Sequence, residues 1–462
     1  MQRSTLIPLI VACALFMENM DSTVIATSLP AIAADIGESP LALKLALTSY
    51  LVGLAVFIPI SSWAADRFGS RSVFAGAIGV FVAGSLLCAA SSTLAGFVGA
   101  RFLQGFGGAM MVPVGRLVLL RAVPKSGLVT ALAWLTMPAL LGPVIGPPLG
   151  GAITLYLQWR WIFLINLPIG ALGLYLVLRH IPNLRASEPP TLDKAGFVLS
   201  GVGLSVLMLG LSSLGGHLMP GGVTAACIVL GAAALAGYAR HARRTPQPLI
   251  DLALFKLPTF HAGAVAGTLF RIGVSSTPFL LPLLLQLGFG LDPLHSGLLT
   301  CAVAVGALFM KALTVAILRR WGFRRVLIVN AAVASAVIAV FGLFTAATPH
   351  YVIVAVLLLS GCLRSLQFTA LQAISFAEVS AASMSQASSL TSMSQRLSQS
   401  LGVAVGAYAL ELSSVVQGHE QVVTEDFWPA FVAMALLSAS SLFFHLRLAP
   451  HAGAEVSGHP KP

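Results

Sequence analysis

Charged residues are scarce in this sequence. They make up 9% of its 462 residues, whereas a typical soluble domain contains roughly a quarter. Hydrophobic residues account for 57% of the chain, and the mean hydropathy is +0.92. A soluble chain of this size needs more polar surface, which excludes a cytosolic enzyme, a secreted domain and a disordered chain. The apolar stretches run for about 20 residues, the length that crosses a bilayer as a helix, and they lack the short alternation of a membrane β-barrel.

Cysteine is also rare, and no two cysteines have the spacing of metal ligands. Each lies in an apolar stretch, which predicts small buried side chains rather than disulfides or ligands: Cys13, Cys88, Cys227, Cys301 and Cys362. The Gly-x-x-x-x-Gly-Lys loop that cradles nucleotide phosphates is missing, and no loop has room for a soluble catalytic domain. We therefore expect no metal and no cofactor, so that any work must draw on an ion gradient or a partner.

Fourteen apolar stretches are candidates for membrane spans. Their approximate ranges are 6–33, 43–64, 72–91, 95–119, 127–152, 161–179, 194–214, 221–239, 260–286, 293–317, 326–347, 351–376, 386–411 and 427–446. This pattern predicts an all-α polytopic membrane protein.

The basic residues gather on one side of the predicted membrane. With the N-terminus inside, most of the 26 Lys and Arg residues lie at the inner side, and only Lys44 and Arg160 lie in outer loops. The outer loops are instead acidic, at Asp35, Glu38, Asp292, Glu420, Glu425 and Asp426. The positive-inside rule therefore predicts two cytoplasmic termini. It also explains the net charge of +11 as topology, without nucleic-acid binding.

Two sequence features recur in the two halves of the chain. The basic loop at 66–71 has a counterpart at 319–325, and the Arg–Leu–Gln element at 101–104 has one at 364–367. Duplicated units of this kind usually enclose a site near the bilayer midplane that opens alternately to either side. The repeat predicts a six-helix bundle at 1–180, two inserted helices with linkers at 181–257, a second six-helix bundle at 258–450 and a cytoplasmic tail at 451–462.

Four motifs resemble those of the major facilitator superfamily, and in particular its fourteen-span drug:proton antiporter branch. They are Met20 to Ile25 with Leu29-Pro30, Asp66 to Arg71, Arg101 with Gln104-Gly105 and Gly107 to Ala109, and Gly142 to Pro147 with Gly150-Gly151. The last is the most specific, because symporters and uniporters generally lack it. The gating loop departs from the family pattern at Ser62 and Ser70, and Arg319 replaces its Asp in the second half.

The resemblance implies proton-coupled efflux of small organic molecules, with Asp21 as the proton carrier. Glu18 lies three residues away and so shares a helix face with Asp21. Two carboxylates this close do not ionise together easily, so one is expected to take up a proton near working pH. Arg101 is the expected counter-charge, which protonation of Asp21 would free. The alternative is that these charges form buried ion pairs that only fix helix packing.

The gating loop and the antiporter motif are expected to control access. Asp66, Arg67, Gly69 and Arg71 are expected to form a latch at the cytoplasmic mouth, the alternative being an ordinary basic inner loop. In the antiporter motif, proline bends a helix and glycine lets a neighbouring helix approach. Together they predict a sealed but bendable contact, made by Gly142, Pro143, Gly146, Pro147, Gly150 and Gly151.

The second half carries one cation in each of four spans. The resemblance implies that these spans line or flank the substrate cavity, together with two glutamines: Arg271, Lys311, Arg364 and Arg396, with Gln104 and Gln367. Charged residues at this depth are costly and normally face a cavity or a partner. The excess of cations favours an organic anion, such as a carboxylate or its metal chelate, whereas the branch favours lipophilic drugs. Alternatively, Arg364 and Arg396 pair with carbonyls or Glu378, and Lys311 reaches the inner interface.

Three other classes of function compete with an exporter. The antiporter motif argues against a proton-coupled importer, and paired intramembrane charges argue against a sensor or scaffold. A membrane-embedded enzyme would need a metal cluster or a nucleophile–base pair, neither of which the sequence displays. We expect a monomer in the inner membrane of a bacterium. Its expected partners are a small-molecule substrate, protons and the lipid bilayer, with no nucleic acid.

Overall fold

The computed structural model describes residues 3–122, 128–183, 185, 191–213, 219–245, 248–249, 252–379, 384–419, 421–450 and 452–453. All regular secondary structure in these ranges is helical. Within them, eleven helical stretches are long and apolar enough to cross a membrane. The chain is therefore an all-helical, multi-pass membrane protein, as its composition predicts.

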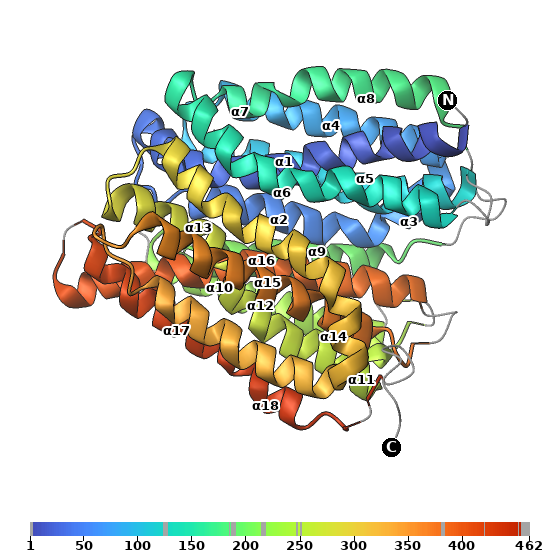
Figure 1. The fold of residues 1–462 in the computed structure, drawn as a ribbon. Helices are drawn as coiled ribbons and strands as arrows, with labels where there is room; N and C mark the ends of the chain where they lie inside the picture. The colour runs from blue at the N-terminus through green and yellow to red at the C-terminus, as the bar shows by residue number, and fades with distance from the viewer. Residues whose placement is uncertain are drawn as a thin grey trace.

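The first half of the chain forms one group of packed helices, coloured blue to teal in Figure 1. They are α1 (Arg3–Ile36), α2 (Lys44–Phe57), α3 (Ser61–Phe68), α4 (Ser70–Ala90), α5 (Leu94–Ala122), α6 (Leu128–Tyr156), α7 (Trp161–Leu164) and α8 (Asn166–His180), with a 3-10 turn at Ile58–Ile60. Helix α1 packs along α6, while α5 lies between α2 and α4. The α3 and α7 labels mark opposite ends of this group, here called the α3 end and the α7 end.

The last part of the chain forms a second group, coloured green to red in Figure 1. It comprises α11 (Pro258–His261), α12 (Gly267–Ser275), α13 (Thr277–Leu283), α14 (Pro293–Phe341), α15 (His350–Ser375), α16 (Met384–Gln417), α17 (Phe427–Ala439) and α18 (Ser441–Leu446). Short π-helical segments at Ala262–Ala266 and Leu284–Gly288 flank α12 and α13, and 3-10 turns lie at Leu252–Lys256 and Thr424–Asp426. Helix α14 packs along α15 and α17, and α12 packs against α16.

Two further helices, α9 (Lys194–Ser212) and α10 (Gly221–Ala242), pack against each other, and α9 also touches α2 and α16. Asp193 caps α9 by accepting a hydrogen bond from Gly196 N at 2.8 Å, and it also accepts one from Leu249 N at 3.2 Å. His241 Nε2 of α10 lies 2.8 Å from the same carboxylate. Partial burial raises the pKa of Asp193, but these hydrogen bonds outweigh burial and hold the pKa below its usual range. Because the Asp193 carboxylate contacts both α9 and His241 of α10, it links the two inserted helices.

The two basic loops of the repeat share a backbone feature. Gly69 separates α3 from α4 with a φ of 95°, and Gly322 interrupts α14 with a φ of 68°. Only glycine adopts such angles at no steric cost. The sequence predicts two spans, 293–317 and 326–347, and α14 likewise consists of two helical parts that meet at Gly322. The loop is shorter than predicted because a single glycine is enough to change the helix direction.

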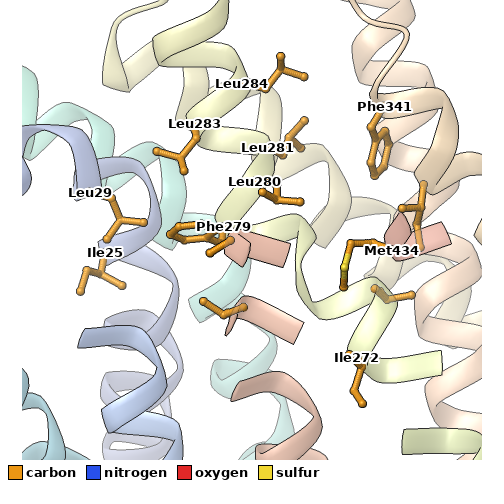
Figure 2. Packing of buried hydrophobic residues seen from close by; sticks show 14 of the residues in the cluster. Ile25, Leu29, Ile272, Phe279, Leu280, Leu281, Leu283, Leu284, Phe341 and Met434 are labelled. Carbon is orange, nitrogen blue, oxygen red and sulfur yellow. The ribbon is translucent and has the colours of Figure 1, made fainter. Parts of the chain in front are cut away.

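The two halves approach each other closely at the α7 end. A β-carbon added to Gly151 of α6 would lie 2.2 Å from Pro293 O of α14, and one added to Gly297 would lie 2.3 Å from Pro147 O. Figure 1 shows α14 beginning beside α6 and diverging from it toward the α3 end. Beside this contact, Phe279 of α13 lies against α1 near Ile25 and Leu29, as Figure 2 shows. These side chains are fully buried in one apolar cluster that spans both halves.

Candidate functional site

Asp21 of α1 and Arg101 of α5 form a buried ion pair. Arg101 Nη1 donates to Asp21 Oδ2 at 2.7 Å, and both side chains are 1% exposed. The guanidinium also lies over the ring of Tyr50, with 4.3 Å from Cζ to the ring centroid. The structure therefore brings together two residues that lie 80 positions apart in the sequence.

The second oxygen of Asp21 is held by two amides. Gln104 Nε2 and Asn166 Nδ2 each donate to Asp21 Oδ1 at 2.8 Å. The same nitrogens contact Ser85 Oγ, at 2.8 and 3.2 Å. Gln104, predicted to line the substrate cavity, is one of the two amides that contact this carboxylate. Sequence reasoning missed Asn166 and Ser85, although each is a polar residue within an apolar span.

Glu18 pairs across the two halves of the molecule. Arg396 Nη2 of α16 donates to Glu18 Oε1 at 3.1 Å, and the Tyr50 hydroxyl donates to the same atom at 3.3 Å. Glu18 is fully buried, whereas the side chain of Arg396 is 24% exposed. Glu18 Oε2 is buried without a hydrogen-bond partner among the described residues. Arg396, predicted to line the substrate cavity, is thus the counter-charge of an acid in the other half.

A second ion pair joins the halves nearer the α7 end. Lys44 Nζ at the start of α2 lies 3.6 Å from Glu411 Oε2 of α16. Lys44, which the charge pattern places at the outer side, is only 1% exposed. Its position at the helix start lets the long side chain reach α16 within the bundle. Helix α16 therefore forms one ion pair with α1 and another with α2.

Arg271 and Arg364 have no acidic partner of this kind in the part of the chain that the structure describes. Arg271 is 1% exposed, and its Nε, Nη1 and Nη2 atoms are buried without hydrogen-bond partners there. Its Cζ atom lies 5.8 Å from the centroid of the Phe368 ring, and that of Arg364 lies 5.7 Å from the same centroid. Lys311 is exposed on α14. Two guanidinium groups thus share one aromatic ring.

Gln367 is engaged within the second half. Its Oε1 accepts from Asn330 Nδ2 at 2.9 Å, and its Nε2 donates to Leu327 O at 3.2 Å and lies 3.3 Å from His445 Nε2. These contacts direct the amide toward α14 and α18. Glu378, considered as a partner for Arg364 or Arg396, accepts instead from the Thr259 hydroxyl at 2.9 Å.

The glycine–proline motif of α6 contacts two different helices. Added β-carbons at Gly146 and Gly150 would lie 2.1 Å from Thr23 Oγ1 and 2.3 Å from Val24 O of α1. Gly142 approaches the same helix at Met20 N. Thr23 donates to Gly142 O at 3.4 Å, and Thr27 donates to Pro147 O at 3.3 Å. Gly151, with Pro147, faces α14 as described above, and Pro143 lies within the same stretch of α6. One stretch of helix therefore serves both the packing of the first half and the contact between halves.

The predicted gating loop surrounds the break at Gly69. Asp66 and Arg67 end α3, and Arg71 lies half-buried at the start of α4, whereas Arg67 is exposed. A β-carbon on Gly69 would lie 2.2 Å from the Oδ1 atom of Asn183, which follows α8.

Asn183 also exchanges hydrogen bonds with Ser72, accepting from its amide at 3.3 Å and donating to its hydroxyl at 3.1 Å. In the second half, Arg324 Nη2 donates to Leu446 O at 3.0 Å. In both halves the loop is therefore held by the segment that ends the last helix. Asn183 lies in a linker with no motif around it, so the sequence did not reveal its role.

The fold and the buried charges define a multi-pass membrane protein with ion pairs buried within the first group of helices and between the two groups. The family profile of the Major Facilitator Superfamily matches residues 11–403 and 263–461. The chain therefore belongs to the major facilitator superfamily and is a transporter, not an enzyme. This agrees with the resemblance that its motifs indicate.

Curated relatives show the same membership, and solved structures show the same fold. The chain is 37% identical to a protein of Serratia proteamaculans (strain 568) named as a multidrug resistance protein, MdtD, over 93% of this chain and 90% of the relative. It is also 37% identical to the MdtD protein of Escherichia coli (strain K12), over 95% and 93%. Among solved structures, a D-xylose–proton symporter superposes with a TM-score of 0.69 at 13% identity, covering 97% of this chain and 98% of the other. The last likeness concerns the fold alone.

Proposed function

We propose that the protein is a proton-coupled antiporter that exports small organic molecules, in the manner of a multidrug efflux pump. The observation that carries this proposal is the Asp21 site. A carboxylate within a membrane-spanning helix is costly and normally serves transport or pairing. The names of the MdtD relatives support export of drugs. The energy source is the proton gradient, and no cofactor is required.

Protonation of Asp21 changes the bonding of this site. As an anion, Asp21 accepts hydrogen bonds from Arg101, Gln104 and Asn166. A proton on either oxygen neutralises the carboxylate and turns one acceptor into a donor. Arg101 then remains charged and buried without a counter-charge, which is strongly unfavourable. Rearrangement of α5 relative to α1 relieves this cost and couples proton uptake to a change of conformation.

The conformation described here is closed at the α7 end. The glycines Gly151 and Gly297 allow backbone contact between α6 and α14, and Gln286 Nε2 donates to Thr27 O across the halves at 2.9 Å. We assign the α7 end to the outer side, which makes this a state closed to the outside. Substrate would enter from the cytoplasm, and separation of the two glycine contacts would release it outside.

The same proposal includes the topology. Helix α6, the stretch from α2 through the following 3-10 turn, and the two parts of α14 on either side of Gly322 complete fourteen spans with the other helices. The start of α1 and the end of α18 lie at the same end of the bundle in Figure 1, as an even number of spans requires. The halves 1–180 and 258–450 rock against each other, with 181–257 between them and 451–462 as a tail. The bacterial relatives support an inner-membrane location, where the chain acts as a monomer with both termini cytoplasmic.

Asp21→Asn tests the proposal directly. Purified protein in proteoliposomes would be assayed for transport of cationic ethidium and anionic 1-naphthoate, with and without a pH gradient. The variant should lose gradient-driven transport but retain exchange of substrate across the membrane at equal pH, because binding and rocking remain. Asp35→Asn is the matched control, since Asp35 pairs with Arg160 at 2.6 Å on the surface and should transport normally. Gradient-driven transport by Asp21→Asn at the wild-type rate would refute the proposal.

A further inference from the structure

The Arg–Leu–Gln element occurs in both halves, but its arginine has different partners in each. In the first half, the arginine of the Arg–Leu–Gln element is neutralised, because Arg101 meets Asp21 at 2.7 Å. In the second half the equivalent arginine is Arg364, and its described contact is the face of Phe368. Instead of a carboxylate, the opposite helix supplies a second guanidinium, that of Arg271. Where the first half has an ion pair, the second half therefore has two arginines beside one aromatic ring.

The helices around this pair cannot neutralise it. Helix α12 packs against α13, α14, α15, α16, α17 and α18. The sequences of these seven helices contain a single acidic residue, Glu411. Glu411 lies near Lys44 at 3.6 Å, and Glu378, which follows α15, accepts from Thr259. The charge on Arg271 and Arg364 is thus not balanced by an acid of the surrounding described helices.

The Arg271 side chain is held in a defined position. A β-carbon added to Gly267 would lie 3.0 Å from Arg271 Nη1, so the guanidinium lies over the turn before it. That turn follows a π-helical segment, Ala262–Ala266, a feature often found at functional sites. All three guanidinium nitrogens are buried without a described partner. A buried charge left unpaired in this way is strongly destabilising, and an anionic ligand would remove that cost.

We infer that Arg271 and Arg364 bind the carboxylate group of an organic anion, with Phe368 beside its apolar part. A guanidinium matches a carboxylate through two parallel hydrogen bonds, and an aromatic face favours a flat organic body. Arg271 lies in the middle of the span Pro258–Gly288, far from the level of lipid headgroups. The inference rests on the proposed function, because the anion is taken to be the exported molecule.

Equilibrium binding tests the inference without a gradient. The full-length protein in an uncharged maltoside detergent would be titrated with 1-naphthoate, 1-naphthamide and 1-naphthylmethylamine, which share one ring system and differ in charge. The naphthoate should bind most tightly. Arg271→Gln and Arg364→Gln should each weaken naphthoate binding by roughly ten- to hundredfold, as expected for the loss of a charged hydrogen-bonded pair. Added phosphatidylglycerol should not displace the naphthoate.

A stability readout separates binding from folding. Arg271→Gln removes an unpaired buried charge, so the ligand-free variant should unfold at the same temperature as the wild type or a higher one. Arg271→Lys should keep the charge but lose most of the affinity, because it lacks the planar fork. Arg160→Gln, at the surface pair with Asp35, is the matched control and should bind normally.

Three results would overturn the inference. They are equal binding of the three probes, unchanged affinity in Arg271→Gln, and displacement of naphthoate by phosphatidylglycerol, which would indicate a lipid site. If the transport rate does not change with the pH gradient while naphthoate binding still depends on Arg271, only the proton-coupled function is overturned. The two proposals therefore fail separately.

Discussion

The ion pair between Glu18 and Arg396 predicts unequal costs for removing its two members. Glu18 is 0% exposed, whereas the side chain of Arg396 is 24% exposed. Arg396→Gln leaves a fully enclosed carboxylate with no counter-charge. Glu18→Gln leaves a guanidinium that still reaches solvent-accessible space, and the new amide can keep the hydrogen bond from the Tyr50 hydroxyl.

The burial of each group sets the expected size of the effect. Breaking a fully buried pair costs about 3–5 kcal/mol, whereas an exposed pair is worth about 0–1 kcal/mol. We expect Arg396→Gln to lower the free energy of unfolding by about 3 kcal/mol and Glu18→Gln by about 1 kcal/mol. The double variant leaves neither charge unpaired, so its cost should be smaller than that of Arg396→Gln alone.

Unfolding of the purified variants in one detergent, followed by circular dichroism, measures these differences as a double-mutant cycle. Asp35→Asn and Arg160→Gln remove the two members of an exposed pair, with side chains 43% and 29% exposed, and serve as controls with effects near zero. Equal costs for Glu18→Gln and Arg396→Gln would refute the reasoning. So would a double variant whose loss equals the sum of the single losses, because the two charges would then not interact.

Three further predictions follow from the packing and capping contacts. Gly150→Val should prevent α1 from packing on α6, because its β-carbon would meet Val24 O at 2.3 Å; expression of folded protein should fall sharply, while Gly76→Val, with nothing within 4 Å, should express normally. Gly151→Val should fold but open the α7 end, since its β-carbon meets Pro293 O at 2.2 Å across the halves; spin-label distances between the halves at that end should lengthen, and unchanged distances would contradict this. Asp193→Ala should lower the free energy of unfolding by about 1 kcal/mol at pH 7. Because the pKa of Asp193 is lowered in the folded protein, this difference should persist above about pH 4 and shrink as the pH falls below it; a deficit independent of pH would argue against the carboxylate cap.

Much of the architecture could be predicted from hydropathy and repeats. Apolar stretches located the helices, and the recurrence of a basic loop with glycine anticipated related breaks at Gly69 and Gly322. The two spans predicted at 293–317 and 326–347 correspond to the two helical parts of α14 on either side of Gly322. Hydropathy detects the basic loop between them but not that a single glycine separates the two helices.

The candidate site was predicted less evenly. Opposite charges in separate spans anticipated the pairing of Asp21 with Arg101, since a buried charge needs a partner. The contacts of Arg396 with Glu18 and of Gln104 with Asp21 were not predicted. Asn183 carried no signal, because a single amide in a linker resembles any other polar loop residue.

The length of the apolar stretches was enough to predict a helical, multi-pass membrane protein, because this length depends on the thickness of the bilayer and little on tertiary contacts. Which charges meet depends on how the helices pack. Glu18 and Arg396 lie 378 positions apart, and their contact depends on the rotation and depth of α1 and α16. The same packing left Arg271 without an acid, because helix faces, and not residue counts, decide which buried charge finds a partner.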